Sequence, residues 1–222
     1  MTGSTLKTKV AIIGLGNIGK AIATNLTIGK HPVILASREI EKSKAFANEL
    51  GSLATAKETV DAIKEADVII PAISFGTLKD FFKTYSAELD GKIIIDVSNP
   101  IAPDGNGGFK KMIGEKEAAA NILHEFIPKS AKLVKAFGTL GAGKLLSDAF
   151  AQPERKVLFY ASDNTNSNNK IEDLISSCGF DPLHIGGLDT AIRIEVFGDL
   201  HQFGALGKTV TLAEAKSKLT NV

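Results

Sequence analysis

The sequence contains a single cysteine, Cys178, and so no pair that could close a disulfide within the chain. Its 26 Lys and Arg residues nearly balance its 25 Asp and Glu residues, so no excess of one sign indicates a nucleic-acid or membrane-surface partner. A secretory signal pattern and a bilayer-length apolar run are also missing. We therefore expect a cytoplasmic protein in a reducing compartment, with no nucleic-acid and no membrane partner.

Groups of residues that carry acid–base or metal chemistry are equally scarce. The four histidines, His31, His124, His184 and His201, are scattered and share no motif, and no Cys or His cluster has metal-ligand spacing. We assign no metal ligand and no catalytic side chain. His201 remains a pocket candidate, and Lys135, near the end of an expected strand, receives no catalytic role.

The most informative feature present is a glycine-rich turn between an apolar run and a helical pattern. Val10–Ile13 has the continuous apolar character of a strand buried on both faces, and it leads into Gly14, Gly16 and Gly19 at G-x-G-x-x-G spacing. Gly14 allows a sharp turn, Gly16 leaves room for a pyrophosphate, and Gly19 lets the helix pack closely. The free N–H groups of that helix then bind negative charge. This context predicts a dinucleotide site.

The residues that select the dinucleotide are expected after a second apolar run, Val33–Ala36, which lies at the distance of a βαβ unit from the first. This run is followed by Ser37 and Arg38. A carboxylate there would favour NAD, whereas a hydroxyl and a guanidinium suit the 2′-phosphate of NADP. Lys42 would add a second positive charge if a helix begins near Glu39. The sequence therefore predicts NADP.

Strands and helices alternate through the rest of the chain, which predicts an α/β fold. We expect a Rossmann-type, doubly wound, mostly parallel sheet with a short C-terminal helical segment. The further expected strands are Ala66–Ala72, Gly91–Val97, Ala131–Phe137 and Val157–Ala161. The expected helices are Glu41–Leu50, Leu78–Tyr85, Ala118–Phe126, Asn168–Cys178 and a helical tail over Ile192–Leu219. Ala102–Gly108 and Asp163–Asn169 are expected as loops. Residues 1–190 would form the NADP-binding domain, and residues 191–222 a tail packed on it in a single compact unit.

Such a sheet binds its ligand across the carboxyl ends of its strands. The candidate pocket residues are therefore those that follow the strands: Ala72, Ile73, Ser74, Phe75, Ser98, Asn99, Pro100 and Gly138–Gly143. Several are small or apolar, which suits a nicotinamide ring and a second flat partner, although turn geometry alone would also explain them. Gly138–Leu145 resembles a phosphate loop, but Leu145 replaces the hydroxyl residue that would hold magnesium, so we reject nucleoside triphosphate hydrolysis.

Four segments in combination, Gly14–Lys20, Ala36–Arg38, Asp96–Pro100 and Leu133–Phe137, resemble a family of NADP-binding reductases. It includes the deazaflavin (coenzyme F420)-dependent NADP oxidoreductases, and the chain is also similar to the cytosolic domain of the six-transmembrane metalloreductases. The resemblance implies pyrophosphate contacts at Leu15, Gly16, Asn17 and Ile18. It implies 2′-phosphate contacts at Ser37, Arg38 and Lys42, and places Ile73, Ser74, Asn99 and Ala142 near the nicotinamide. The expected cofactor site is completed by Gly14, Gly19, Ala72, Ser98, Pro100 and Gly138.

The resemblance further implies hydride transfer between NADP(H) and a flavin or deazaflavin stacked on the nicotinamide, in a homodimer with a small-molecule hydride acceptor. Two departures bear on the acceptor. Gly138 stands where the deazaflavin-dependent members place a His, and the sequence has no counterpart of the metalloreductases' membrane-spanning half. Two alternatives stay open: an NADP-dependent dehydrogenase of a small carbonyl or imine, and a non-catalytic NADP-binding redox sensor.

Overall fold

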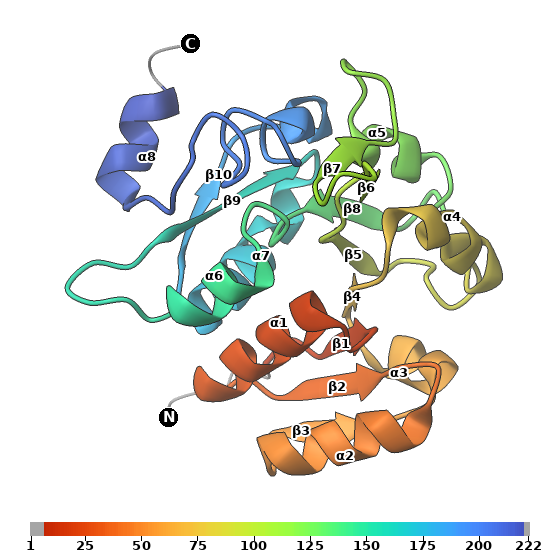
Figure 1. Cartoon of the computed structure of the whole chain (residues 1–222). Helices are drawn as coiled ribbons and strands as arrows, with labels where there is room; N and C mark the ends of the chain where they lie inside the picture. Colours follow the sequence, from red (N-terminus) through yellow and green to blue (C-terminus); the bar gives the residue numbers. More distant parts are fainter. Residues whose placement is uncertain (1–6, 220–222) are drawn as a thin grey trace.

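The structure is a computed structural model that describes residues 7–219, so the outer ends of the two expected segments, residues 1–6 and 220–222, lie outside the described residues. Its centre is an eight-stranded sheet with the order β10-β9-β8-β5-β4-β1-β2-β3 (Figure 1). The strands are β1 (Val10–Ile13), β2 (Val33–Ala36), β3 (Ala54–Ala56), β4 (Val68–Pro71), β5 (Ile93–Asp96), β8 (Lys132–Lys135), β9 (Val157–Ser162) and β10 (Asp181–His184). A separate hairpin is formed by β6 (Ile101–Pro103) and β7 (Phe109–Lys111).

Helices cover both faces of the sheet. They are α1 (Asn17–Ile28), α2 (Ile40–Leu50), α3 (Thr59–Glu65), α4 (Phe75–Thr84), α5 (Ala119–His124), α6 (Ala142–Ser147), α7 (Thr165–Ser177) and α8 (Leu212–Leu219). Consecutive strand residues point to opposite faces, so Val10 and Ile12 of β1 join the core under α1, α2 and α7, whereas Ala11 and Ile13 join the core under α3, α4 and α5. This burial on both sides explains the continuous apolar runs of the sequence.

The sheet is mostly parallel, as the sequence predicts. Strands β1 to β5 and β8 run in one direction; β9 pairs antiparallel with β8, through Val134 and Ser162, and β10 runs parallel to β9. The chain leaves β1 toward β2 and β3, then returns to place β4 on the other side of β1. This reversal opens a crevice at the carboxyl ends of β1 and β4, where doubly wound sheets bind ligands.

The expected tail helix over Ile192–Leu219 is wrong as a continuous element. A 3-10 helix, Leu188–Arg193, is followed by turns, and α-helix returns only in α8. The turns fold the backbone onto itself: a Cβ on Gly198 would lie 2.4 Å from the carbonyl oxygen of Arg193, and a Cβ on Gly204 only 1.8 Å from that of Gly198. Because Gly198 and Gly204 have no Cβ, the backbone can make these close contacts in turns, and a continuous helix does not form.

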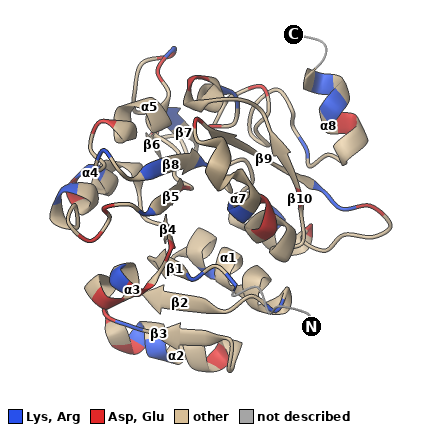
Figure 2. Ribbon diagram, turned by 180° about the vertical axis from the view of Figure 1, so that it is seen from behind, with Lys and Arg blue, Asp and Glu red and all other residues tan. Residues whose placement is uncertain are grey.

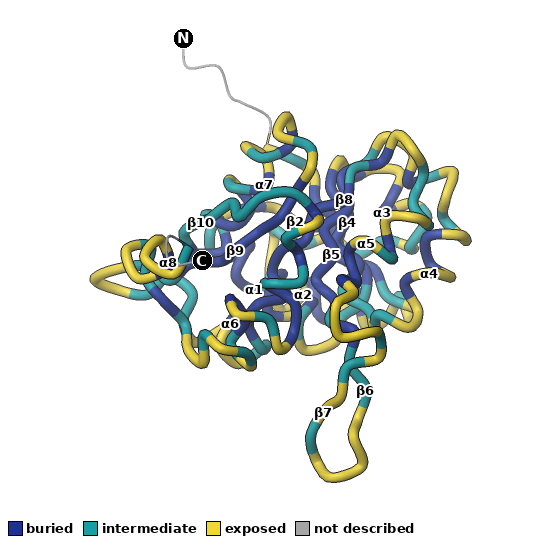
Figure 3. The backbone as a smooth tube through the Cα atoms, turned by 90° about the horizontal axis from the view of Figure 1, so that it is seen from above, coloured by how far each residue is buried: buried dark blue, intermediate teal, exposed yellow. Residues whose placement is uncertain are grey.

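Two expected loops also differ from the structure. Ala102 and Pro103 belong to β6, so only the tip of that segment is a loop, and the hairpin extends away from the body with its tip exposed (Figure 3). The polar run from Asp163 does not stay a loop either, because α7 begins at Thr165. Besides the hairpin strands and the 3-10 helix, four short elements, β3, α3, α6 and β10, were not expected from the sequence.

Lys and Arg residues alternate with Asp and Glu residues along the surface helices (Figure 2). Within residues 7–219, no helix is long and apolar enough to cross a membrane. The same residues include no group of three His, Cys, Asp or Glu side chains placed to hold a metal ion.

Candidate functional site

The three glycines of the turn have three different structural roles. Gly14 has a φ of +100°, and a Cβ there would lie 2.6 Å from the carbonyl oxygen of Ala72. A Cβ on Gly19 would lie 2.0 Å from the carbonyl oxygen of Gly14, so this position fixes how closely α1 packs on the turn. Gly16 caps α1 with an extended backbone, and a Cβ there would meet nothing within 4 Å. Space is therefore open at the helix N-terminus, where an anion binds.

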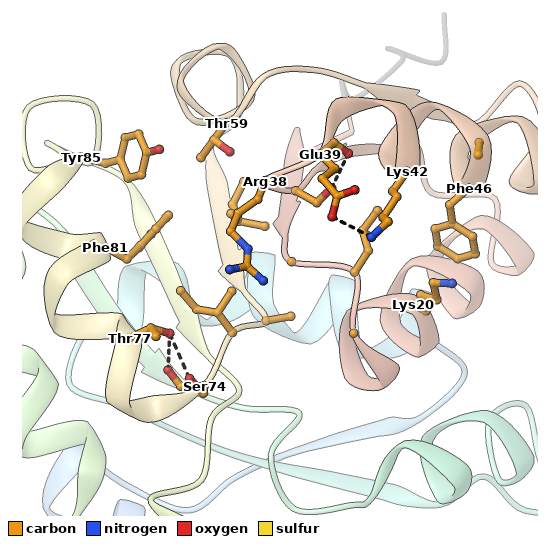
Figure 4. A pocket seen from close by; sticks show the side chains of 18 of the residues that line it. Lys20, Arg38, Glu39, Lys42, Phe46, Thr59, Ser74, Thr77, Phe81 and Tyr85 are labelled. Atoms are coloured by element: carbon orange, nitrogen blue, oxygen red, sulfur yellow. Dashed lines mark hydrogen bonds and ion pairs between the residues drawn. The ribbon is translucent and has the colours of Figure 1, made fainter.

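A first cavity of about 760 Å³ lies at the ends of β1, β2 and β4. It extends from α1 and α2 past Arg38 to α4 (Figure 4). Its walls include the expected residues Gly14, Leu15, Gly16, Ser37, Arg38, Lys42, Ala72, Ile73 and Ser74. Lys20 also lines this cavity, with its Nζ 5.1 Å from the centre of the Phe46 ring, and was not expected as a site residue. Its position directly after Gly19, at the start of α1, could have indicated a cation near the glycine turn.

The expected 2′-phosphate residues differ in how free they are. Arg38 is exposed and has no hydrogen-bond or ion-pair partner among the described residues. Lys42 is paired with Glu39, with 2.6 Å between Nζ and Oε1. Ser37 Oγ donates to the carbonyl oxygen of Glu39 at 2.9 Å and also lies 2.8 Å from Ser43 Oγ. Arg38 is thus the cation available at once, while Lys42 must first leave Glu39.

A second cavity of about 600 Å³ lies on the other side of Gly16 and the Ala72–Ser74 segment, which line both cavities. From the expected set it contains Asn17, Ile18, Ser98, Asn99 and Gly138, together with Phe75 and Gly141. His201 also lines it. The lining residues not expected from the sequence are Gly76, Val97, Ile101, Ala102, Pro103, Met112, Val196 and Phe203. Within the described part of the chain, no Lys, Arg, Asp or Glu side chain lines this cavity.

Hydrogen bonds fix the floor of the second cavity around the carbonyl oxygen of Gly138. It accepts from Asn99 Nδ2 and lies 2.9 Å from His201 Nε2. The Phe203 N–H donates to His201 Nδ1 at 2.9 Å, so Nδ1 is the acceptor and Nε2 carries the proton. Asn99 Oδ1 accepts from the Val196 N–H at 2.7 Å, which ties the C-terminal segment to this floor.

His201 is neutral at physiological pH. Burial lowers its pKa to about 4, and the nearby Lys135 charge acts in the same direction, against the raising effect of the bond to Gly138. The side chain is therefore a fixed structural donor. It adds no charge to the second cavity.

Three expected contact residues line neither cavity. Gly19 acts through the turn, as described above, and Ala142 opens α6 beside the lining residue Gly141. The carbonyl oxygen of Pro100 accepts from the Met112 N–H at 2.7 Å and so anchors the hairpin. A cofactor contact at these three positions stays a prediction.

A buried charge cluster lies beside the second cavity. Lys135 on β8 pairs with Asp96 at the end of β5, with 2.7 Å between Nζ and Oδ2, and Glu195 Oε1 lies 3.6 Å from the same Nζ. All three side chains are at most 1% exposed. The partners of Lys135 could not be identified from the sequence, because Asp96 and Glu195 lie 39 and 60 residues away along the chain. The sheet and the C-terminal segment bring them together.

Comparison with known proteins decides the family. Residues 9–100 match the family model described as NADP oxidoreductase, coenzyme F420-dependent. These residues therefore carry the domain of this oxidoreductase family, and the chain is similar in sequence to F420-dependent NADP reductases and metalloreductases. The match covers the glycine turn, Ser37-Arg38 and the segment after β5, and it confirms the resemblance stated from the sequence.

Three relatives show the extent of the similarity. A hypothetical protein of known structure from Sinorhizobium meliloti is 30% identical, with a TM-score of 0.81 over 92% of this chain and 95% of that chain. An F420-dependent NADP reductase of Methanothermobacter marburgensis is 24% identical over 84% of this chain and 88% of its own length. The metalloreductase STEAP3 of Rattus norvegicus is 27% identical over 84% of this chain. Our chain spans 36% of that metalloreductase.

Proposed function

We propose that the chain binds NADP(H) across the two cavities and transfers hydride between it and a flavin or deazaflavin ring seated in the second cavity. The first cavity fits the adenosine phosphate end. Its open space at Gly16 suits a pyrophosphate at the N-terminus of α1. Arg38, without a partner in the described residues, suits the 2′-phosphate. The named relatives among the reductases support this choice of cofactor.

The observation that carries the choice of acceptor is the uncharged, mostly apolar lining of the second cavity. Carboxylate substrates need a cation to replace their lost hydration, and the described lining has none. A flat, neutral ring loses little hydration in such a place. The lining therefore favours a flavin-like ring over a small keto, hydroxy or imino acid.

The chain's own groups would orient the two rings and exclude water. NADPH, when bound, supplies a hydride from its nicotinamide, so no proton-transferring side chain is needed for that transfer. Asn99 and His201 both hold the Gly138 carbonyl, which keeps the cavity floor rigid. Ile73 and Ser74 stand between the two cavities and contribute to both. Such fixed walls favour reaction by positioning two bound partners.

Stopped-flow measurement of NADPH oxidation tests this proposal, with flavin mononucleotide, flavin adenine dinucleotide and deazaflavin as separate acceptors. We expect turnover with at least one. Tight NADPH binding without turnover on any of the three would instead favour a redox sensor, and turnover only with a small neutral carbonyl or imine would favour a dehydrogenase.

The proposal includes a homodimer, which static light scattering of the purified chain tests. A mass near 47 kDa would support it, since one chain has a mass of 23.4 kDa. A concentration-independent mass of one chain would contradict it.

A further inference from the structure

The buried cluster of Asp96, Lys135 and Glu195 has no part in the hydride transfer proposed above. Two carboxylates face one ammonium, so its formal charge is −1. Burying such a group is costly unless every member is paired and hydrogen-bonded. One negative charge of the cluster is not balanced by a cation, and it lies beside the second cavity.

Each carboxylate also accepts hydrogen bonds from backbone N–H groups. Asp96 Oδ1 accepts from the Ser98 N–H at 2.8 Å, while its Oδ2 faces Lys135. Glu195 accepts from the N–H groups of Ala119 and Ala120 at 2.8 and 3.0 Å. The cluster is therefore a fixed arrangement of charges with satisfied polar atoms.

Lys135 is held as a cation. Desolvation lowers its pKa, but the charges of Asp96 and Glu195 outweigh that effect and raise the pKa above its ordinary value. Its ammonium group also donates to the carbonyl oxygen of Ser98 at 2.5 Å. One positive and two negative charges are thus present together.

The cluster adjoins the second cavity through the backbone. Asp96 is followed by Val97 and Ser98, which line the cavity, and Glu195 is followed by the lining residue Val196. The intervening wall includes Val97, Ser98 and Val196, and the cluster is shielded from solvent. A field in such surroundings is screened far less than one at the surface.

We propose that this cluster makes the site favour the oxidised cofactor, because the oxidised nicotinamide ring carries a positive charge that the reduced ring lacks. The proposal rests on the proposed function, which places the nicotinamide at the second cavity. When NADPH gives up a hydride, its ring passes from neutral to cationic, and the nearby surplus negative charge stabilises that change. Asp96 and Glu195 are positioning residues in this account, because they act through the field and touch no reacting atom. The site therefore favours hydride donation by NADPH.

Calorimetric dissociation constants for NADP⁺ and NADPH test the proposal in the whole chain. The unmodified protein should bind NADP⁺ at least as tightly as NADPH. Glu195→Gln removes one negative charge at nearly constant volume, and the ratio of the NADP⁺ constant to the NADPH constant should rise about fivefold, as expected for one partly screened charge. A purely structural role would weaken both cofactors equally and leave the ratio unchanged.

Glu195→Asp is the matched control, since it shortens the side chain but keeps the charge. Its ratio should stay at the unmodified value even if both affinities fall. Asp96→Asn removes a charge from another strand and should raise the ratio in the same direction, so the test does not depend on one variant that folds poorly. The measurement on the unmodified protein needs no variant at all.

The outcomes separate this inference from the function on which it rests. An unmodified protein that binds neither cofactor overturns the proposed function and the inference together. Binding of both cofactors with an unchanged ratio in Glu195→Gln and Asp96→Asn overturns the inference alone. The inference is also overturned if the unmodified protein binds NADPH clearly more tightly than NADP⁺.

Discussion

The two cavities on either side of the glycine turn share a wall but differ in their chemistry. The first is lined by Lys20, Arg38 and Lys42 and by two glutamates, whereas the described lining of the second has no charged side chain. Charged hydrogen bonds distinguish phosphate patterns, while an apolar slot selects flat shape and excludes water. This difference supports the proposal that the first cavity selects the cofactor by charge and the second selects the acceptor by shape.

The largest expected change in stability lies at the glycine turn that both cavities share. Two Gly→Ala variants there should show which glycine is needed for folding and which for NADPH binding. Gly19→Ala places a Cβ 2.0 Å from the Gly14 carbonyl oxygen, so α1 must move away. We expect a loss of about 3 kcal/mol in the free energy of unfolding, together with loss of NADPH binding. Urea unfolding and calorimetry measure the two effects.

Gly16→Ala is the counterpart, because the added methyl group meets no protein atom within 4 Å and the backbone φ of −73° is ordinary for alanine. Stability should change by less than about 0.5 kcal/mol, whereas NADPH affinity should fall because the methyl group enters the proposed phosphate space. Unchanged affinity in Gly16→Ala would place the pyrophosphate elsewhere. Gly143→Ala, also in open space, controls for a general glycine effect.

The charged side of the comparison is tested by Arg38→Ala. Loss of a charged hydrogen bond should weaken NADPH binding by about 1.5 to 3 kcal/mol and leave NADH binding nearly unchanged. Titration with both cofactors measures the difference. Lys44→Ala, on α2 but outside the first cavity, should have no such effect. Equal losses for the two cofactors in Arg38→Ala would contradict the 2′-phosphate assignment.

The contrast between the cavities also explains what the sequence could predict. β1, α1 and β2 follow from local signals, and the strands Val10–Ile13 and Val33–Ala36 have the predicted bounds. The residues expected to face the cofactor phosphates follow directly from that motif. About half of the first cavity's lining was therefore predictable, whereas the side chains of Phe46, Phe81 and Tyr85 on α2, on α4 and after α4 were not.

The second cavity depends on contacts between segments that are distant in sequence. Val196 and Phe203 come from the C-terminal turns and reach the cavity because Asn99 bonds to Val196 and His201 to Gly138. The sequence pattern of this segment predicted a helix, and the turns depend instead on close backbone contacts at Gly198 and Gly204. β3 escaped prediction because three residues are too few to show a periodic pattern.

On the apolar side, His201 should make stability depend on pH. Its pKa is about 4 in the folded chain and about 6.5 when unfolded, so the unfolded state gains a proton first as pH falls. Stability should decrease by about 2 kcal/mol between pH 8 and pH 5 on this account. Denaturant unfolding of the unmodified protein and of His201→Gln measures the difference.

The variant should lack that part of the pH dependence. His31, whose pKa is also lowered by burial, is present in both proteins, so its contribution cancels in the difference. Parallel stability curves for the two proteins would show that His201 is charged inside the fold. The lining of the second cavity would then carry a positive charge at His201, and the two cavities would no longer differ in this way.

The smallest expected effect concerns Glu39, which brings a negative charge into the cavity proposed for phosphates. It holds Lys42 at 2.6 Å, and both side chains are largely exposed. Glu39→Gln should free Lys42 and tighten NADPH binding by about 0.5 to 1 kcal/mol without changing NADH binding, because exposed ion pairs are weak. Glu41→Gln breaks an equivalent pair with Lys44 outside the first cavity and should change neither affinity. If Glu39→Gln tightened both cofactors equally, the gain would reflect general repulsion of phosphates. The Glu39–Lys42 pair would then not distinguish NADP from NAD, and Arg38 alone would have to do so.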